Sequence, residues 1–382
     1  MSAMTELSET KRIVIFRALQ LGDMLCSVPA LRALRRAAPH AHIALIGLPW
    51  AKSFVERFSD LLDELIVFPG ARGFPEQRED ESALPGFTAA MRERCFDLAI
   101  QLHGSGGVAN DIVGQFGARA YAGFVQPGET RDGCFIAWPD TLPEPRRYLA
   151  LTGALGAPAD SDALAFELTP QDLSEHVALV AMHRIVVERL VVVHPGAQLP
   201  SRRWPAERFA KVADALAADG WRIAITGTAS EIEISGRLLG TMAGPALHLV
   251  GATSLGALAA LVRDARLVVC NDTGISHIAA AMRTASVVVA SGSDTRRWAP
   301  LDHQLHRVLA DYPPCRPCAF RDCPYGHECA LNVGVERVVE AAREQLGNHA
   351  ATMHATGEHA AAAYIPDVPA SSSVRREAPH AR

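Results

Sequence analysis

The sequence lacks a long uninterrupted run of apolar residues. Its longest apolar stretches are broken by charged residues, among them Arg263, Asp264, Arg266 and Arg283, whereas a membrane-spanning helix needs about 20 consecutive apolar residues. The first twelve residues, MSAMTELSETKR, contain no apolar core of the kind that a secretory signal requires. We therefore expect a protein of the cytosol.

The sequence also has no excess of positive charge. Its 37 lysines and arginines are outnumbered by 42 aspartates and glutamates, which gives a formal net charge of -5. Proteins that bind nucleic acid usually present a basic patch that neutralises backbone phosphates. The charge balance therefore argues against a nucleic-acid partner, and it leaves small anionic ligands open.

Disulfides are not expected, because the eight cysteines of a cytosolic chain should be reduced. Four of them gather late in the sequence, at Cys315, Cys318, Cys323 and Cys329. The first two form a C-x-x-C pair, but the spacing of the second two does not fit a standard zinc ribbon. Two interpretations stay open for this quartet: a structural metal site, or a group of reduced thiols.

Short apolar runs alternate with helical patterns along most of the 382 residues. A chain of this length exceeds one ordinary core, and alternating strands and helices predict parallel α/β sheets, so we expect two Rossmann-like domains facing each other across a cleft. The predicted strands are residues 12–16, 42–46, 64–68, 97–102, 119–124, 190–194, 221–226, 247–250, 267–270 and 286–290. The predicted helices are residues 23–39, 50–58, 87–94, 108–116, 146–155, 205–219, 231–242, 255–264 and 273–282. Pro29 fits the first helix only if it lies in the first turn.

The stretch from Gly156 to about Pro170 has no sustained pattern, and we place the domain boundary there. This predicts an N-terminal domain over residues 1–160 and a C-terminal domain over residues 171–348. From residue 349 the chain is rich in Ala, His, Pro and Ser, which predicts a disordered tail over residues 349–382.

The segment LVVCNDTGISHIAAAM, residues 267–282, reads as a buried strand, a tight turn and an alanine-rich helix. The first amides of such a helix have no partner within it, so they suit an anion, typically a phosphate. Thr273 adds a hydroxyl, Gly274 allows close approach, and His277 follows one turn later. The alternative is purely structural: Asp272 would cap the helix, and His277 would bond to a neighbour.

Two more loops follow predicted strands in the second half of the chain. His194-Pro195-Gly196 leads to Arg202 and Arg203, and a glycine followed by cations is what a diphosphate site needs. Thr226-Gly227-Thr228 leads to Glu231, whose carboxylate could accept hydrogen bonds from two vicinal hydroxyls. A turn with solvated arginines and a carboxylate favourably placed on a helix dipole are the structural alternatives.

Two features of the first half could carry chemistry. Asp23 follows the first predicted strand, where it is either a helix-capping residue or a catalytic carboxylate. Residues 104–109, GSGGVA, satisfy a dinucleotide-binding pattern, but they do not follow the first strand, so a dehydrogenase is disfavoured. The adjacent His103 is a candidate for the acceptor side of the cleft.

Taken together, these segments resemble the heptosyltransferase family, glycosyltransferase family 9. The matching residues are Gly22-Asp23-Met24-Leu25, His194-Pro195-Gly196, Arg202 before Trp204-Pro205, Glu231, and Asp272-Thr273-Gly274 with His277. Arg202 stands where lysine is common in the family, and the cysteine-rich segment is also similar. The resemblance covers about residues 12–345.

The resemblance implies the GT-B fold, with an N-terminal acceptor-binding domain and a C-terminal domain that binds a nucleotide sugar. It assigns Asp23 as general base, Arg202 as stabiliser of the departing diphosphate, and Glu231 as the residue that holds the ribose. Gly196, Asp272, Thr273, Gly274 and His277 complete the donor site, and no cofactor is required.

The implied reaction is an inverting transfer of heptose from ADP-L-glycero-D-manno-heptose to a lipopolysaccharide inner core or a related glycan. Its acceptor would be a lipid-linked oligosaccharide, so we expect peripheral contact with the cytoplasmic face of the inner membrane. Two alternatives remain at this stage: a nucleotide-sugar epimerase of GT-B-like fold, and a non-enzymatic ADP-sugar-binding protein.

Overall fold

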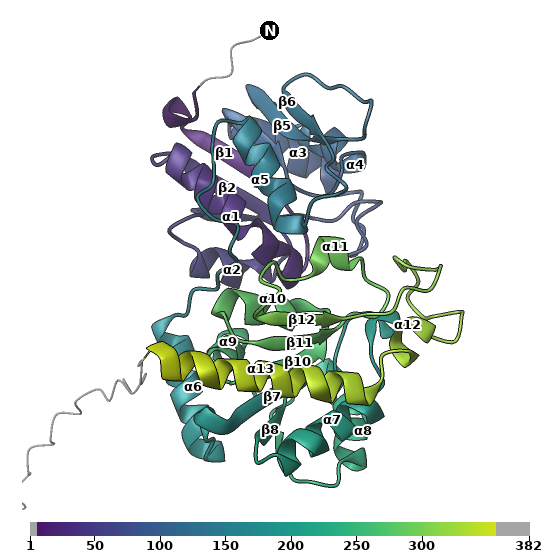
Figure 1. The fold of residues 1–382 in the computed structure, drawn as a ribbon. Coiled ribbons are helices and arrows are strands. Elements are labelled where there is room, and N and C mark those ends of the chain that lie inside the picture. Colours follow the sequence, from purple (N-terminus) through teal and green to yellow (C-terminus); the bar gives the residue numbers. More distant parts are fainter. Residues whose placement is uncertain (1–5, 357–382) are drawn as a thin grey trace, which may run out of the picture.

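Runs of branched apolar residues form the central strands of two parallel sheets, which lie one above the other in Figure 1. The structure is a computed structural model that describes residues 6–356. In the first sheet Ile13, Val14 and Ile15 are buried, and in the second Val192 and Val193 are buried. Helices cover both faces of each sheet, which is why these strands are apolar along their whole length.

The N-terminal half contains one six-stranded sheet and five α-helices. Its strands are β1 Arg12–Phe16, β2 His42–Gly47, β3 Glu64–Val67, β4 Leu98–Gln101, β5 Ala120–Val125 and β6 Cys134–Ala137. Its helices are α1 Leu21–Ala37, α2 Ala51–Arg57, α3 Leu84–Glu93, α4 Val108–Val113 and α5 Glu144–Ala154.

The C-terminal half repeats this plan with a second six-stranded sheet. Its strands are β7 Leu190–His194, β8 Arg222–Ile225, β9 Leu247–His248, β10 Leu267–Asn271, β11 Ser286–Val289 and β12 His306–Leu309. Its α-helices are α6 Pro170–His183, α7 Ala206–Ala218, α8 Ile232–Thr241, α9 Leu255–Asp264, α10 Gly274–Met282, α11 Thr295–Trp298, α12 Glu328–Leu331 and α13 Val335–Thr356.

Both sheets have the strand order of a Rossmann fold. The first runs β3-β2-β1-β4-β5-β6, and the second runs β9-β8-β7-β10-β11-β12. In such sheets ligands bind beyond the carboxyl ends of the strands where the order reverses, which here means β1 and β4 in one half and β7 and β10 in the other. The predicted α/β fold with two Rossmann-like sheets is confirmed.

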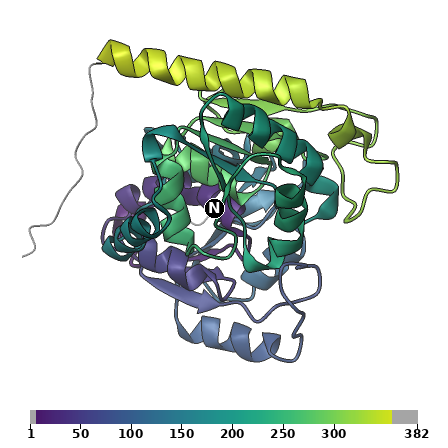
Figure 2. The same cartoon turned by 90° about the horizontal axis from the view of Figure 1, so that it is seen from below.

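Two edge strands, β6 and β12, and four helices, α6, α11, α12 and α13, were not predicted. β12 contains His306 and Arg307 and so does not form a continuous apolar run. β6 is apolar, but it has only four residues, and none of them is fully buried. α6 begins with a capping box formed by Thr169 and Asp172. The long helix α13 packs across the second half against α7 and β11 (Figure 2). It runs through Thr356, past the predicted start of the tail, and residues 357–382 lie outside the described part of the chain.

The position of Pro29 differs from the prediction. The first helix begins at Leu21, so Pro29 lies in its interior, where it cannot donate a hydrogen bond to the carbonyl four residues before it. Its neighbours Val28 and Ala30 are buried. We attribute the persistence of the helix to this packing, since a proline in a helix interior costs about 3 kcal/mol.

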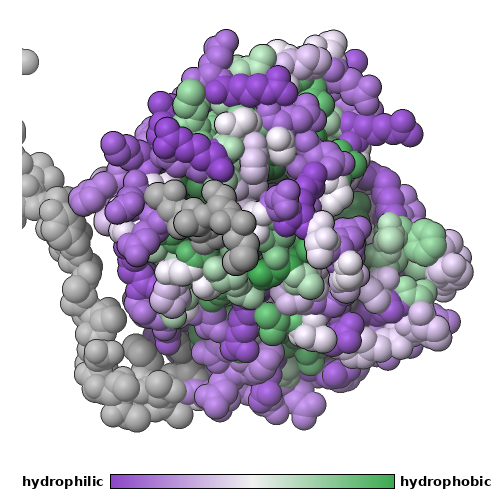
Figure 3. Space-filling model, turned by 90° about the horizontal axis from the view of Figure 1, so that it is seen from above, coloured by the Kyte–Doolittle hydropathy of each residue, from purple (hydrophilic) through white to green (hydrophobic). Residues whose placement is uncertain are grey.

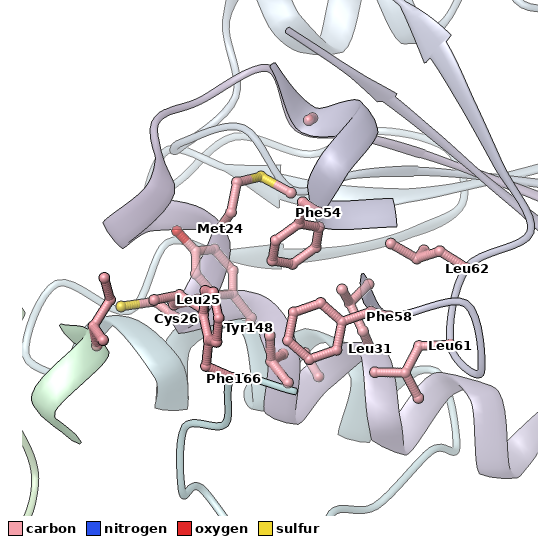
Figure 4. Packing of buried hydrophobic residues seen from close by; sticks show 14 of the residues in the cluster. Met24, Leu25, Cys26, Leu31, Phe54, Phe58, Leu61, Leu62, Tyr148 and Phe166 are labelled. Atoms are coloured by element: carbon pink, nitrogen blue, oxygen red, sulfur yellow. The ribbon is translucent and has the colours of Figure 1, made fainter. Parts of the chain in front are cut away.

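A single hydrophobic cluster crosses from one half to the other. It joins Met24, Leu25 and Tyr148 of the first half to Ile275 and Ile278 of α10. Figure 4 shows the part around α1 and α2, where the sulfur of Cys26 points toward the green helix of the second half. The two halves are therefore in contact through packed apolar side chains as well as through charges.

The outer face of the first half is mostly hydrophilic when seen from above, with apolar atoms in scattered patches (Figure 3). Among the helices described between residues 6 and 356, we find none that combines the length and the apolar character needed to cross a membrane.

Candidate active site

The candidate residues lie at the carboxyl ends of the strands where the order reverses. Asp23 follows β1 and His103 follows β4 in the first half. Gly196 follows β7 and Asp272 follows β10 in the second half. The two sets come together because the two halves face each other through these loops (Figure 1).

The N-termini of α1 and α10 meet at the boundary between the halves. A Cβ atom added at Gly22 would lie 2.7 Å from Cδ2 of His277, and one added at Gly274 would lie 3.7 Å from Cδ2 of Leu21. The sulfur of Cys26 is 3.8 Å from Nδ1 of His277. The motif that contains Asp23 and the motif that contains Thr273 and His277 therefore face each other directly, as the cleft hypothesis requires.

Asp23 lies in the first turn of α1 and remains partly accessible to solvent. Desolvation raises its pKa above the ordinary value, and the nearby charge of Glu144 acts in the same direction, although Arg17, His277 and Arg297 oppose the shift. A carboxylate with a raised pKa is a stronger base, which suits proton abstraction from a hydroxyl.

Arg17 is buried behind Asp23. Its guanidinium donates hydrogen bonds to the carbonyl oxygens of Leu102 and Asp23, and it lies 4.2 Å from the centre of the Tyr148 ring. These bonds fix the backbone at the start of α1. They go to carbonyl oxygens, so the Asp23 carboxylate is not held in a hydrogen bond by this arginine.

The turn before α10 has the geometry expected of an anion site. Thr273 is the N-cap residue, it is fully extended, and its side chain makes no capping hydrogen bond. Asn271, which is completely buried, accepts a hydrogen bond from the amide of Trp204 (2.9 Å) and donates to the carbonyl of Pro195 (2.8 Å). It thereby ties this turn to the loop after β7, a role that the sequence did not suggest.

Arg202 lies near this turn, close enough for the charge of Asp272 to act on it. It donates to the carbonyl of Cys318 (2.7 Å), and it is partly buried. Burial lowers its pKa, and the charge of Asp272 counteracts this effect. An arginine remains a cation under any ordinary condition, so it supplies a fixed positive charge to this part of the cleft.

Glu231 lies directly against Gly196. A Cβ added at Gly196 would come within 1.9 Å of Oε1 of Glu231, so any larger residue at that position would displace the Glu231 carboxylate. The other oxygen, Oε2, accepts hydrogen bonds from the amide and the hydroxyl of Thr228 (2.8 and 2.9 Å). Glu231 therefore completes a capping box with Thr228 through one carboxylate oxygen, and the second oxygen faces the loop after β7.

His277 is buried, and burial lowers its pKa, although Asp272 and Asp23 act to raise it. We take the ring as neutral at neutral pH, in which state it donates one hydrogen bond and carries no charge. The start of α1, which carries Asp23, thus faces Gly274 and His277 of α10, while Arg202 lies near Asp272 and Glu231 lies against Gly196.

The sequence model of glycosyltransferase family 9 (heptosyltransferase) matches residues 87–328, well over half of the chain. The chain belongs to this family. Lipopolysaccharide heptosyltransferase 2 of Salmonella typhimurium is 25% identical over 86% of this chain and 97% of its own length. The enzyme of the same name from Escherichia coli is also 25% identical, over 86% of this chain and 97% of its own.

Solved structures of the family share the fold. A family 9 glycosyltransferase from Veillonella parvula aligns with a TM-score of 0.74 at 23% identity, covering 88% of this chain and 98% of that one. An Escherichia coli heptosyltransferase determined with ADP-2-deoxy-2-fluoro heptose aligns with a TM-score of 0.57 at 18% identity, covering 87% and 99%. Family membership makes the chain a glycosyltransferase, and heptose transfer in lipopolysaccharide synthesis is the activity of the family.

His103 of this glycosyltransferase lies just beyond the end of β4 and is partly exposed. Its ring packs against Phe16 and Phe74, with centroids 5.4 and 4.9 Å away, and its Nδ1 accepts a hydrogen bond from the amide of Ala18 (3.2 Å). Burial, followed by the charge of Arg17, lowers its pKa to about 3. The ring is therefore neutral, and with Nδ1 accepting, the proton is on Nε2.

The four late cysteines are free thiols. Cys318 and Cys329 are buried, whereas Cys315 and Cys323 are partly exposed. Within residues 6–356, no three His, Cys, Asp or Glu side chains are arranged so that they could hold a metal ion. The arrangement gives no support to the metal interpretation of the quartet. The amide of Cys318 instead donates to the carbonyl of Gly292 (2.7 Å), which places this loop against Arg202.

A cavity of about 330 Å³ lies between the halves on the far side of α10. Cys26, Arg146, His277, Trp298 and His306 are among the residues that line it. Of the predicted site residues, only His277 lines this cavity.

Two charged residues near Asp23 were not among the predicted site residues. Glu144 is the first residue of α5 and is completely buried, and Arg297 of α11 donates to it from the other half. Neither position lies in a recognisable motif. In the sequence, Glu144 is a glutamate followed by a proline, and Arg297 is the second of two consecutive arginines. Both patterns are typical of surface residues.

Proposed function

We propose that this glycosyltransferase moves a heptose from ADP-L-glycero-D-manno-heptose to a hydroxyl of a lipopolysaccharide inner core or a related lipid-linked glycan, with inversion at the anomeric carbon. The observation that carries the proposal is the meeting of two helix N-termini: α1, which carries Asp23, faces α10, which carries His277. That a related Escherichia coli enzyme has been determined with an ADP-heptose analogue supports this choice of donor.

In the proposed reaction, Asp23 accepts the proton of the acceptor hydroxyl while the oxygen of that hydroxyl attacks the anomeric carbon of the donor sugar. The bond between that carbon and the diphosphate oxygen breaks, and its electron pair leaves on ADP. The raised pKa of Asp23 makes the carboxylate a better proton acceptor once it is ionised. The base and the leaving group then lie on opposite sides of the sugar, which is the geometry of a single displacement.

The departing diphosphate develops negative charge, and the second half offers groups that would stabilise it. The amides at Thr273 and Gly274 begin α10, where the helix dipole favours an anion. Arg202 adds a full positive charge, and neutral His277 adds one hydrogen-bond donor. With these groups the reaction needs no metal ion.

The nucleotide would lie along the loops after β7 and β8. Gly196 lets the donor approach the backbone closely, and Glu231 has one oxygen directed at this loop. We assign that oxygen to the ribose hydroxyls. The acceptor would enter from the first half, near the loops around β6, and the lipid would place the enzyme at the cytoplasmic face of the inner membrane.

The test is release of ADP from ADP-heptose by the purified protein, with and without a core acceptor. Asp23→Asn keeps the size of the side chain but removes the base, so transfer should slow by roughly 10²- to 10⁴-fold. Donor binding, measured by calorimetry with ADP, should be unchanged.

Three other results would each contradict the proposal. Conversion of the sugar without acceptor would indicate an epimerase. Binding without turnover would indicate a sensor of ADP-sugars. An Asp23→Asn enzyme with the wild-type rate would remove the proposed base.

A further inference from the structure

Glu144 and Arg297 form an ion pair that crosses from one half to the other. The guanidinium of Arg297 donates from Nε to Oε2 of Glu144 at 2.5 Å and from Nη2 to Oε1 at 2.9 Å. This is a two-bond contact between a planar donor and a planar acceptor, the strongest geometry available to such a pair. We call Glu144 and Arg297 the cleft ion pair.

The surroundings of the cleft ion pair limit its access to water. Glu144 is completely buried, and the Arg297 side chain is 30% exposed. The guanidinium lies 4.4 Å from the ring centre of Trp298 and 5.5 Å from that of Trp138, one ring from each half. Its neighbour Arg296, by contrast, is 83% exposed and pairs with Asp294 of its own loop. Of these two consecutive arginines, only Arg297 forms an ion pair with the other half.

A chain of contacts links the cleft ion pair to Asp23. The hydroxyl of Tyr148 donates to Glu144. The Tyr148 ring supports Arg17, which donates to the backbone carbonyl of Asp23. Glu144, Tyr148 and Arg17 therefore connect Arg297 of the second half to the backbone of the proposed base.

We propose that Glu144 and Arg297 are positioning residues for the transferase reaction: closure of the two halves joins them, and their union places Asp23 and neutralises the buried negative charge beside it. This inference rests on the proposed function, since it assigns Asp23 as the base. Neither residue contacts the reacting atoms in this account. They act through Tyr148 and Arg17 and through the local electric field.

The expected pH dependence follows from the charges that surround Asp23. The charged or titratable groups that act on it are Arg17, Glu76, Glu144, His277 and Arg297. Cys26 and Tyr148 are also near, but burial raises the pKa of each well above its ordinary value, so both stay neutral. Glu144 stays ionised because hydrogen bonds from Arg297 and Tyr148 lower its pKa despite burial.

The two partners of the cleft ion pair therefore shift the pKa of Asp23 in opposite directions. Removing the cation leaves Glu144 uncompensated, which raises the pKa of Asp23 and moves the acidic limb of the kcat profile to higher pH. Removing the carboxylate moves the limb to lower pH. Each shift should be about one pH unit, the size expected for a nearby charge.

The experiment compares Arg297→Gln, Glu144→Gln and the double variant, with Arg296→Gln as the matched control. Small-angle scattering with saturating ADP measures how closed the halves are, and the pH profile of kcat measures Asp23. Both single variants should be more open than the wild type, with kcat lowered about tenfold, and their acidic limbs should shift in opposite directions. The double variant should be open with a limb near that of the wild type, and Arg296→Gln should match the wild type in everything.

The outcomes separate this inference from the proposed function. If Asp23→Asn is inactive but the single variants leave both scattering and acidic limb unchanged, the positioning role is refuted and the transfer mechanism stands. Limbs that move in the same direction would also refute it, because they would indicate general damage to the fold. If the variants open the enzyme while Asp23→Asn remains active, the cleft ion pair controls closure but the assigned base is wrong.

Discussion

Between residues 6 and 356, two ion pairs join the halves of this enzyme, and they are built differently. The first is the cleft ion pair, Glu144 with Arg297, which has one partner in a short four-residue helix. The second joins Arg57 of α2 to Asp172 of α6, and we call it the linker ion pair because it lies at the connection between the halves. Both of its side chains are buried, with 8% and 9% exposure.

The partners of the linker ion pair are also fixed to the backbone around them. Arg57 donates to the carbonyl of Glu167 and lies 4.2 Å from the centre of the Phe166 ring. Asp172 accepts the amide of Thr169 at 2.8 Å, and it lies so close to Gly256 that an added Cβ would meet it at 1.7 Å. No comparable set of backbone contacts holds Arg297. The linker ion pair is therefore the more firmly held of the two contacts between the halves.

The strongest test of this difference is Arg57→Met, which keeps the apolar stem and removes the charge. It leaves Asp172 buried without its cation, so the free energy of unfolding should fall by about 3 kcal/mol, while kcat of the folded enzyme should be nearly unchanged. The measurement is chemical denaturation together with transfer kinetics. As the matched control, Arg32→Met removes an exposed pair with Glu167 and should cost less than about 1 kcal/mol.

The linker ion pair should also make the stability of the protein depend on pH in the acidic range. Burial alone would raise the pKa of Asp172, but hydrogen bonds from Arg57 and Thr169 outweigh it and lower the pKa. The stabilisation is therefore complete above the ordinary aspartate pKa of about 3.9 and is lost as the pH falls below it. Arg57→Met should flatten this part of the stability curve. An unchanged curve would show that the pair contributes little.

The next test disturbs the contact between α1 and α10. In Gly22→Ala the new methyl group would lie 2.7 Å from His277, so one helix must shift, and overpacking of this kind costs about 2 kcal/mol. We expect kcat/KM to fall roughly 30-fold, although alanine is the better helix former. Gly153→Ala in α5 meets nothing within 4 Å and is the control. Equal activities of the two variants would mean that the helix N-termini do not meet during catalysis.

The smallest expected effect belongs to a residue that takes part in neither ion pair. Glu231→Gln keeps the size of the side chain and removes its charge, so KM for the donor should rise about tenfold, equivalent to one strong hydrogen bond. Scattering and unfolding should match the wild type. Glu233→Gln is the control, because Glu233 is exposed in the first turn of α8, which begins directly after Glu231. A changed kcat with unchanged KM would exclude a role in holding the ribose.

Much of the site was predictable because its residues follow apolar strands in short, recognisable loops. The segments around Asp23, Gly196 and Thr273 were each identified from a strand, a turn and the start of a helix. Glu144, Arg297 and Asn271 could not be found in this way. Their roles depend on partners 67 to 153 positions distant in the chain, and no local pattern records such a contact.

The sequence by itself determined the two parallel sheets, the helices that cover them and the loops that carry Asp23 and Thr273. These features depend on local periodicity and on the conformations that glycine and proline allow, and both are encoded within a few residues. Only the tertiary structure decided that Gly22 must accommodate His277, that Pro29 can lie inside a helix, and that Arg297 crosses to Glu144. Such outcomes depend on packing and electric fields between distant segments, which arise only when the two halves come together.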